Sequence, residues 1–154
     1  MSSSYKEIIC EVKPRDSKKL RNGFPLILKE AIVSPQKLQE EGQILKLVDD
    51  SGRFIAKGYF GKQNKGYGWV LTRQENESIN QEFFDGKIQK ALDKRAYYFQ
   101  QEDTTAFRVF NSEGDGIGGL IIDFYDGYFV IQWYSQGIYS FKELTAITAS
   151  CYVI

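Results

Sequence analysis

Histidine is absent from this sequence of 154 residues, and its absence excludes several kinds of site. A Ser-His-Asp triad and an imidazole general base both need this side chain, and nearly all zinc sites use it. Cysteine is also scarce. Cys10 and Cys151 lie far apart and form no C-x-x-C pair, a pattern that indicates a reducing cytosol rather than a disulfide-bonded scaffold.

Long apolar runs are missing as well. No segment approaches the roughly 20 apolar residues that a membrane-spanning helix needs. The N-terminal MSSSYKEII also lacks the basic and then apolar pattern of a secretory signal. We therefore expect a cytoplasmic protein that binds neither a membrane nor a metal ion.

The charges are unevenly distributed along the chain, although they sum to zero. Residues 1–73 hold 14 Lys and Arg against 8 Asp and Glu, a net charge of +6. Residues 74–154 hold 6 against 12, a net charge of −6. This division indicates two modules with different partners, of which the basic one is expected to bind a polyanion.

Residues 1–73 are predicted to form a small β-barrel, because short apolar runs alternate with turn signals every 8–12 residues. A basic helical turn with Leu20 as its buried anchor should occupy residues 13–23. Pro25 argues against a central ladder position, so residues 24–28 are placed at a sheet edge. Strands are expected at residues 5–12, 31–33, 44–48, 54–59 and 67–73.

Residues 74–79 are predicted to be a polar linker, and residues 80–154 a small α+β domain. Ser78 and Gln81 have capping-box spacing, and an apolar stripe then recurs at helical spacing to about residue 100. An antiparallel meander is expected at residues 107–134, with its last turn at Asp126-Gly127, and a second helix at residues 139–148. The overall fold class is therefore mixed and mainly β.

The glycine-rich corner between the first two strands of this meander also reads G-x-G-x-x-G, at Gly114, Gly116 and Gly119. That fingerprint binds dinucleotides only when it opens a helix, whereas here a strand is expected to follow. The corner's acids, Glu113 and Asp115, could with Asp123 serve a hydrolytic reaction, but acids are also common turn formers. The sequence favours a wide glycine corner without a cofactor.

Two groups of cations with neighbouring aromatic side chains form the candidate RNA-binding surface, since cations neutralise phosphates and aromatic rings stack on unpaired bases. The alternative is a plain solvated face. The first group is Lys13, Arg15, Lys18, Lys19, Arg21 and Lys29 with Phe24. The second group is Lys62, Lys65, Tyr67, Trp69 and Arg73.

Two segments resemble the RlmI-type rRNA methyltransferases. The stretch from Arg21 to Leu26, R-N-G-F-P-L, is similar to that family's R-x-G-H-P-W after the first strand of its PUA domain. The stretch from Phe107 to Asp123 is similar to its Y-R-L-V-N-x-E-x-D-G-L-P-G-L-x-V-D motif. The departures are Phe24 for His, Leu26 for Trp and Gly118 for Pro. The resemblance places Gly23, Phe24 and Pro25 beside the RNA-binding face.

This resemblance implies a PUA barrel and a connector domain that dock rRNA for a cytosine-C5 methyltransferase. The family's S-adenosylmethionine site and catalytic cysteines belong to a Rossmann-like domain that these residues do not match. Neither Cys10 nor Cys151 corresponds to a catalytic cysteine. We therefore expect no cofactor and no methyl transfer by this chain alone, and we interpret it as the front part of something longer.

A rival hypothesis treats the chain as a protein-interaction module with no RNA role. In that interpretation the acidic half and the apolar tail, residues 152–154, form a homodimer or recruit another protein. The basic face would then be plain solvent surface.

Overall fold

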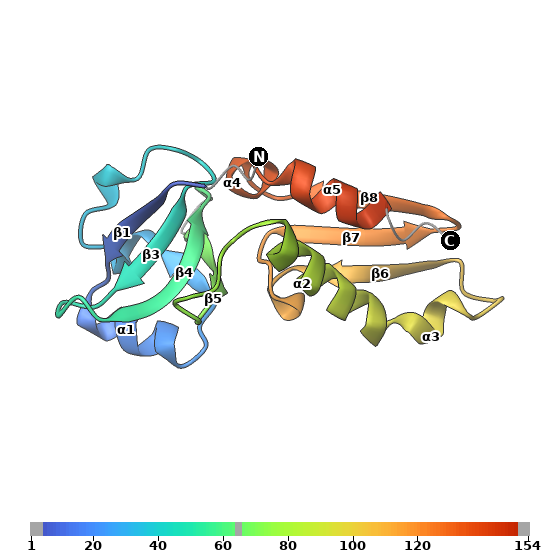
Figure 1. Ribbon diagram of the computed structural model, residues 1–154, viewed down its shortest axis with the longest axis horizontal. Helices are drawn as coiled ribbons and strands as arrows, with labels where there is room; N and C mark the ends of the chain where they lie inside the picture. The colour runs from blue at the N-terminus through green and yellow to red at the C-terminus, as the bar shows by residue number, and fades with distance from the viewer. Residues whose placement is uncertain (1–4, 64–65, 151–154) are drawn as a thin grey trace.

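The computed structural model describes residues 5–63 and 66–150, which form two lobes side by side along the long axis of the molecule (Figure 1). The N-terminal lobe is built on a five-stranded sheet and the C-terminal lobe on a three-stranded one. The expected fold class, a β-barrel followed by a small α+β unit, is confirmed. The division of the chain at residues 73 and 80 stays a prediction.

The N-terminal lobe places its strands in the order β1-β3-β4-β5-β2. β1 pairs with β3 in parallel, and every other neighbouring pair is antiparallel. Its elements are β1 (Glu7–Glu11), α1 (Pro14–Arg21), β2 (Leu26–Leu28), η1 (Lys29–Ala31), η2 (Pro35–Lys37), β3 (Ile44–Val48), β4 (Phe54–Phe60) and β5 (Gly66–Thr72). β2 lies at the end of this order, as Pro25 predicted.

The sheet closes into a barrel where β1 ends. Val12 forms an isolated antiparallel bridge with Ile32, and the Lys13 amide donates to the Ala31 carbonyl at 2.9 Å. The strand predicted at residues 31–33 was therefore wrong. Ala31 ends a 3-10 turn, so only the single bridge at Ile32 remains to pair with β1.

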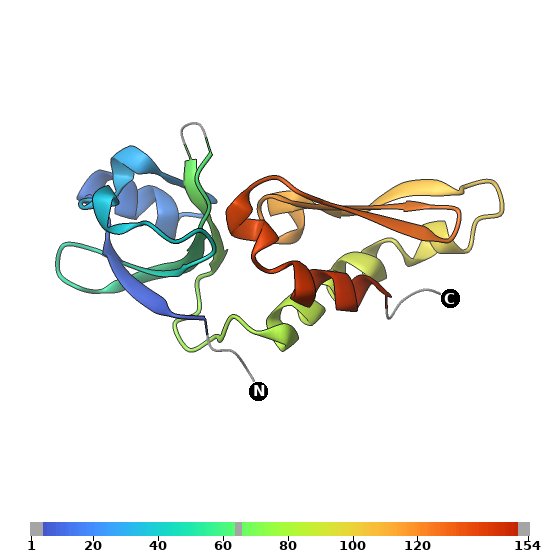
Figure 2. The same cartoon turned by 90° about the horizontal axis from the view of Figure 1, so that it is seen from above.

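The C-terminal lobe is an antiparallel meander in the order β6-β7-β8, with helices on one of its faces (Figure 2). Its elements are α2 (Gln81–Lys94), α3 (Ala96–Phe99), β6 (Ala106–Asn111), η3 (Ser112–Asp115), β7 (Leu120–Tyr125), β8 (Tyr128–Trp133), α4 (Gln136–Tyr139) and α5 (Lys142–Ser150). The turn at Asp126 (φ 43°) and Gly127 (φ 94°) has the positive φ angles of a tight hairpin, as predicted.

Two details of the helical region differ from the sequence prediction. The N-cap of α2 is Asn80, whose side chain accepts a hydrogen bond from the Phe83 amide, and not Ser78. The single helix expected to continue to about residue 100 is also interrupted, and Tyr97 and Tyr98 are 66% and 46% exposed. The long helix breaks at Arg95, and of the three aromatic residues that follow it only Phe99 packs against the core.

The two lobes share apolar packing. Ile44, Tyr59 and Leu71 of the barrel belong to the same buried cluster as the inner side chains of the meander and α2. The buried Tyr59 hydroxyl donates to the Gly118 carbonyl at 2.6 Å, which joins β4 to the glycine corner. Each lobe therefore helps to position the other.

No helix in the described part of the chain is both long enough and apolar enough to cross a bilayer.

Candidate nucleic-acid interface

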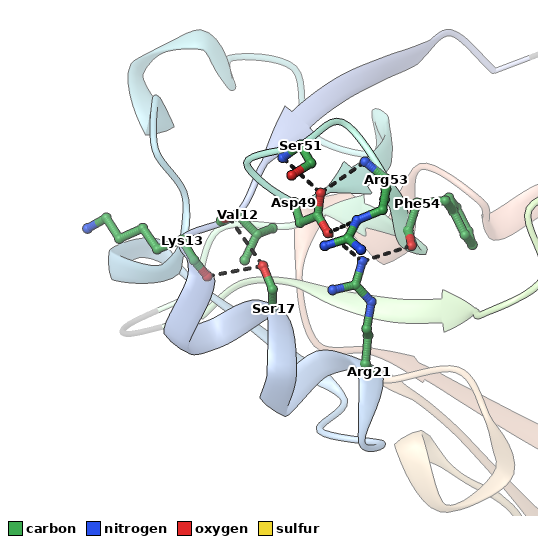
Figure 3. Close-up of polar contacts among 8 residues, drawn as sticks. All are labelled: Val12, Lys13, Ser17, Arg21, Asp49, Ser51, Arg53 and Phe54. Carbon is green, nitrogen blue, oxygen red and sulfur yellow. Dashed lines mark hydrogen bonds and ion pairs between the residues drawn. The ribbon is translucent and has the colours of Figure 1, made fainter.

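Helix α1 is fixed on the barrel by its inner face. Leu20 is fully buried, and the buried Ser17 hydroxyl lies within hydrogen-bond distance of the Val12 and Lys13 carbonyls, at 3.3 and 3.1 Å (Figure 3). Residues three and four apart share a helix face, so Arg15, Lys18 and Lys19 lie together on the opposite, outward face.

Arg21 fastens the end of α1 to the β3–β4 turn. Its guanidinium donates to the Asp49 carboxylate at 2.9 Å and to the Phe54 carbonyl at 3.3 Å (Figure 3). Asp49 also accepts hydrogen bonds from the Ser51 and Arg53 amides. Burial alone would raise the pKa of Asp49, but the hydrogen bonds from Arg53, Arg21 and Ser51 outweigh it and lower this pKa to about 2.

Arg73, at the end of β5, holds the loop that follows α1. Its guanidinium donates to the Leu20 carbonyl at 3.0 Å and to the Phe24 carbonyl at 3.2 Å. Between these two residues Gly23 has a φ of 106°, which a residue with a side chain would rarely adopt. Arg21 and Arg73 thus both shape this loop, and their direct contact with RNA stays a prediction.

The remaining cations, Lys13 just before α1 and those within the helix, are exposed. Within residues 5–63 and 66–150, Lys13, Arg15 and Lys18 form no ion pair, and Figure 3 shows the Lys13 side chain extending away from the barrel. Lys19 lies 3.8 Å from Asp16, a surface pair that contributes little to stability. This face of α1 can therefore neutralise phosphates without first breaking a strong pair.

Apolar side chains flank these cations. Phe24 is 41% exposed just beyond the end of α1, and Pro25 beside it is half-buried. The exposed Lys29 places its ammonium 5.7 Å from the centre of the Tyr67 ring. The structure thus gathers most of the first predicted group, Gly23 included, on and around α1, whereas Lys29 lies in η1 beside Tyr67.

The second predicted group does not form one surface. Tyr67 is buried in the barrel core against Phe60, whereas Trp69 belongs to the cluster shared with the other lobe. A Cβ atom on Gly118 would lie only 2.2 Å from the Trp69 ring, so the indole packs directly on this glycine. Lys62 is exposed, and Lys65 lies outside the described residues.

Asp115 of the glycine corner and Asp123 of β7 have structural partners. Asp115 pairs with Arg95 at 2.7 Å and with Lys94 at 3.4 Å, and it accepts a hydrogen bond from the Asn111 amide. Burial alone would raise the pKa of Asp115, but the hydrogen bonds from Arg95 and Asn111 outweigh it and lower this pKa. Asp123 pairs with Arg108 at 2.8 Å. These pairs stabilise the corner rather than prepare two carboxylates for hydrolysis.

The corner continues into strand β7, as the sequence predicted, so it does not present the helix N-terminus of a dinucleotide fingerprint. Among the described residues, no group of three or more His, Cys, Asp or Glu side chains could hold a metal ion. The absence of a cofactor from this chain stays a prediction.

Sequence reasoning missed a cleft between the lobes. It has a volume of about 540 Å³ and is lined by Gln63, Trp69, Ser112, Gly119, Ile121 and Tyr134. Only Trp69 was a candidate. Among the residues that line the cleft, Ser112 has a positive φ of 51°, which is unusual for a residue other than glycine. The sequence does not reveal this conformation.

Comparison with known proteins agrees with this architecture. The family described as "PUA-like domain" matches residues 11–73. The "Putative ribosomal RNA large subunit methyltransferase YwbD" of Bacillus subtilis (strain 168) is 52% identical over 137 residues, which cover 88% of this chain and 35% of that protein. "Ribosomal RNA large subunit methyltransferase I" of Aliivibrio fischeri (strain ATCC 700601 / ES114) is 33% identical over 132 residues, which cover 86% of this chain and 33% of that protein.

A solved structure described as "A putative sam-dependent methyltransferase from Streptococcus mutans" superimposes with a TM-score of 0.83 at 30% identity, covering 94% of this chain and 37% of that one. This chain thus spans about a third of the length of the curated relatives above. It carries a PUA-like domain and is homologous to the N-terminal third of the RlmI-type ribosomal RNA large subunit methyltransferases.

Proposed function

We propose that this chain is the RNA-docking front part of an S-adenosylmethionine-dependent methyltransferase that acts on cytosine C5 in large-subunit rRNA. The observation that carries the proposal is the row of unpaired cations on the outward face of α1, within the segment that matches the PUA-like family. The names of the homologous proteins support rRNA as the polyanion.

In this proposal the barrel binds RNA mainly through its backbone. Lys13, Arg15 and Lys18 neutralise phosphates, and the release of condensed counterions supplies much of the affinity. The exposed ring of Phe24 stacks on an unpaired base at the end of the helix. Arg21 and Arg73 contribute by holding the loop between them in place.

The acidic lobe has a different role in this proposal. Its net charge of −6 disfavours contact with phosphates, and the sheet face opposite its helices exposes Tyr125, Tyr128 and Val130. We propose that this lobe packs against a catalytic domain outside the present chain. That domain would bind S-adenosylmethionine and supply the catalytic cysteines.

The rival hypothesis of a homodimer stays a prediction, because its central feature, the tail at residues 152–154, lies outside the described residues.

Charge reversal tests the RNA-docking proposal. The double variant Arg15→Glu/Lys18→Glu should bind an rRNA fragment at least about tenfold more weakly near 0.1 M salt, because two phosphate contacts are lost. The slope of log K against log salt should also become shallower by about two. Arg21 is left unchanged, since it holds Asp49.

A matched pair of single variants provides the control. Lys18→Glu and Lys90→Glu both reverse one exposed helical cation, the first on α1 and the second on α2 of the acidic lobe. Only Lys18→Glu should weaken binding and reduce the salt slope. Equal effects from both variants, or no effect from the double variant, would contradict the proposal.

A further inference from the structure

The cleft between the lobes is a built site rather than a gap left between two domains. Gln63 and Trp69 line it from the barrel, and Ser112 and Tyr134 line it from the meander. The Gln63 side-chain amide donates to the Tyr134 carbonyl at 2.9 Å, a hydrogen bond that spans the two lobes. Its volume of about 540 Å³ lies within the usual range for sites that bind small ligands.

Two aromatic side chains from opposite lobes reach this cleft. Trp69 is held in place because its indole packs on the backbone of Gly118, whose carbonyl is fixed in turn by Tyr59. Tyr134 is 57% exposed, and its hydroxyl donates to the Gln132 side chain at 2.8 Å. Much of the Tyr134 ring is therefore free to stack on a planar ligand.

The cleft also offers polar groups that can form further hydrogen bonds. The Ser112 hydroxyl accepts a hydrogen bond from the Gly119 amide at 2.8 Å and keeps its own proton to donate. Among the described residues, neither the Trp69 indole N–H nor the side-chain carbonyl oxygen of Gln63 has a hydrogen-bond partner. Ser112 holds a left-handed φ of 51°, and such strain is concentrated at ligand sites.

Aromatic surfaces combined with donors and acceptors suit a flat heterocycle with polar edges. Bases that are unpaired in RNA are recognised in this way, by stacking and by hydrogen bonds along their edges. We infer that the cleft binds one unpaired nucleobase of the RNA docked on α1, an inference that rests on the proposed function.

An RNA hairpin in three forms tests the inference. One form carries a single-nucleotide bulge, the second carries an abasic nucleotide at the bulge, and the third is fully paired. The wild-type chain should bind the bulged form about tenfold more tightly than either of the others, a ratio typical of one stacked base. Affinities are measured by fluorescence anisotropy at constant salt.

Two variants of Tyr134 separate stacking from folding. Tyr134→Ala should abolish the preference for the bulged form while leaving the affinity for the paired form unchanged. Tyr134→Phe should keep the preference, because the ring remains. Both variants should unfold at the same temperature as the wild type, because Tyr134 is exposed, and thermal unfolding checks this.

The outcomes separate this inference from the proposed function. If the wild-type chain binds all three hairpins equally while Arg15→Glu/Lys18→Glu weakens all of them, the base-binding inference is wrong and RNA docking stands. A preference for the bulge that survives Tyr134→Ala also overturns the inference. If no hairpin binds the wild-type chain, both are wrong.

Discussion

The two lobes use the same kinds of charged residue in opposite ways. In the barrel, the buried acid Asp49 is paired with Arg21 and Arg53, and the outward cations of α1 are left to solvent. In the C-terminal lobe, Arg95 at the end of α2 and Arg108 of β6 are occupied by carboxylates of the glycine corner and of β7. The net charge of a lobe therefore does not by itself show which of its cations are free to meet a polyanion.

The lobes nevertheless share one apolar cluster, so their surfaces differ while their stability is coupled. Substitutions at the junction therefore test this shared stability, and charge substitutions test each surface separately.

The largest stability effect is expected at Gly137, where the two backbones meet. A Cβ atom there would lie 2.4 Å from the Phe60 carbonyl oxygen and 2.5 Å from the Gly61 Cα, and neither backbone atom can move aside easily. Gly137→Ala should lower the free energy of unfolding by about 3 kcal/mol, as measured by urea denaturation.

Gly86→Ala is the matched control for this variant. Gly86 lies in the interior of α2, and no atom lies within 4 Å of an added Cβ. This substitution should stabilise the protein by up to about 1 kcal/mol, because alanine favours the helix. If Gly137→Ala proved as stable as the wild type, the close junction between the lobes would be wrong.

A smaller effect is expected from Tyr59→Phe. This variant removes the hydroxyl that donates to the Gly118 carbonyl at 2.6 Å and leaves a buried acceptor without its partner. The loss should be about 1–2 kcal/mol, measured by the same denaturation. An unchanged unfolding curve would show that the hydrogen bond does not help to join the lobes.

The response to acid is expected to depend on Asp49. Its pKa is lowered to about 2 in the folded protein, so its contribution to stability is fully present above its unfolded value of about 4. That contribution is lost as the pH falls from about 4 toward 2. Asp49→Asn should be less stable at neutral pH and should show a flatter loss of stability over this range, measured by unfolding at a series of pH values. A wild-type slope retained in Asp49→Asn would contradict this assignment.

The smallest stability effect is expected from Lys19→Ala. Lys19 lies 3.8 Å from Asp16 in an exposed pair, so its removal should change the free energy of unfolding by less than about 0.5 kcal/mol. RNA affinity should fall nonetheless if the outward face of α1 binds phosphates. A large loss of stability would instead assign Lys19 to the fold.

Much of the fold follows from local sequence signals. The Asp126-Gly127 turn and the buried anchor Leu20 both depend on neighbouring residues, and the structure confirms both. The helix start was misplaced because both Ser78 and Asn80 are good N-cap residues, and only the structure shows which side chain accepts the Phe83 amide.

The candidate site was harder to predict, because it depends on contacts between distant segments. Arg21 was grouped with the other cations of α1, yet its partner Asp49 lies 28 residues away in the sequence. Trp69 was assigned to a basic surface, but the meander covers its face of β5. The alternation of side chains along a strand assigns them to the two faces of the sheet. It cannot show that a second lobe covers the outer face.

The most direct test of the account is an amide chemical-shift titration of the ¹⁵N-labelled chain with a fragment of large-subunit rRNA. RNA docking on α1 predicts that the largest shifts occur at residues 13–24, around its outward face, and that they weaken as salt is added. Large shifts confined to the outer surfaces of α2 and the meander, with residues 13–24 unchanged, would contradict it.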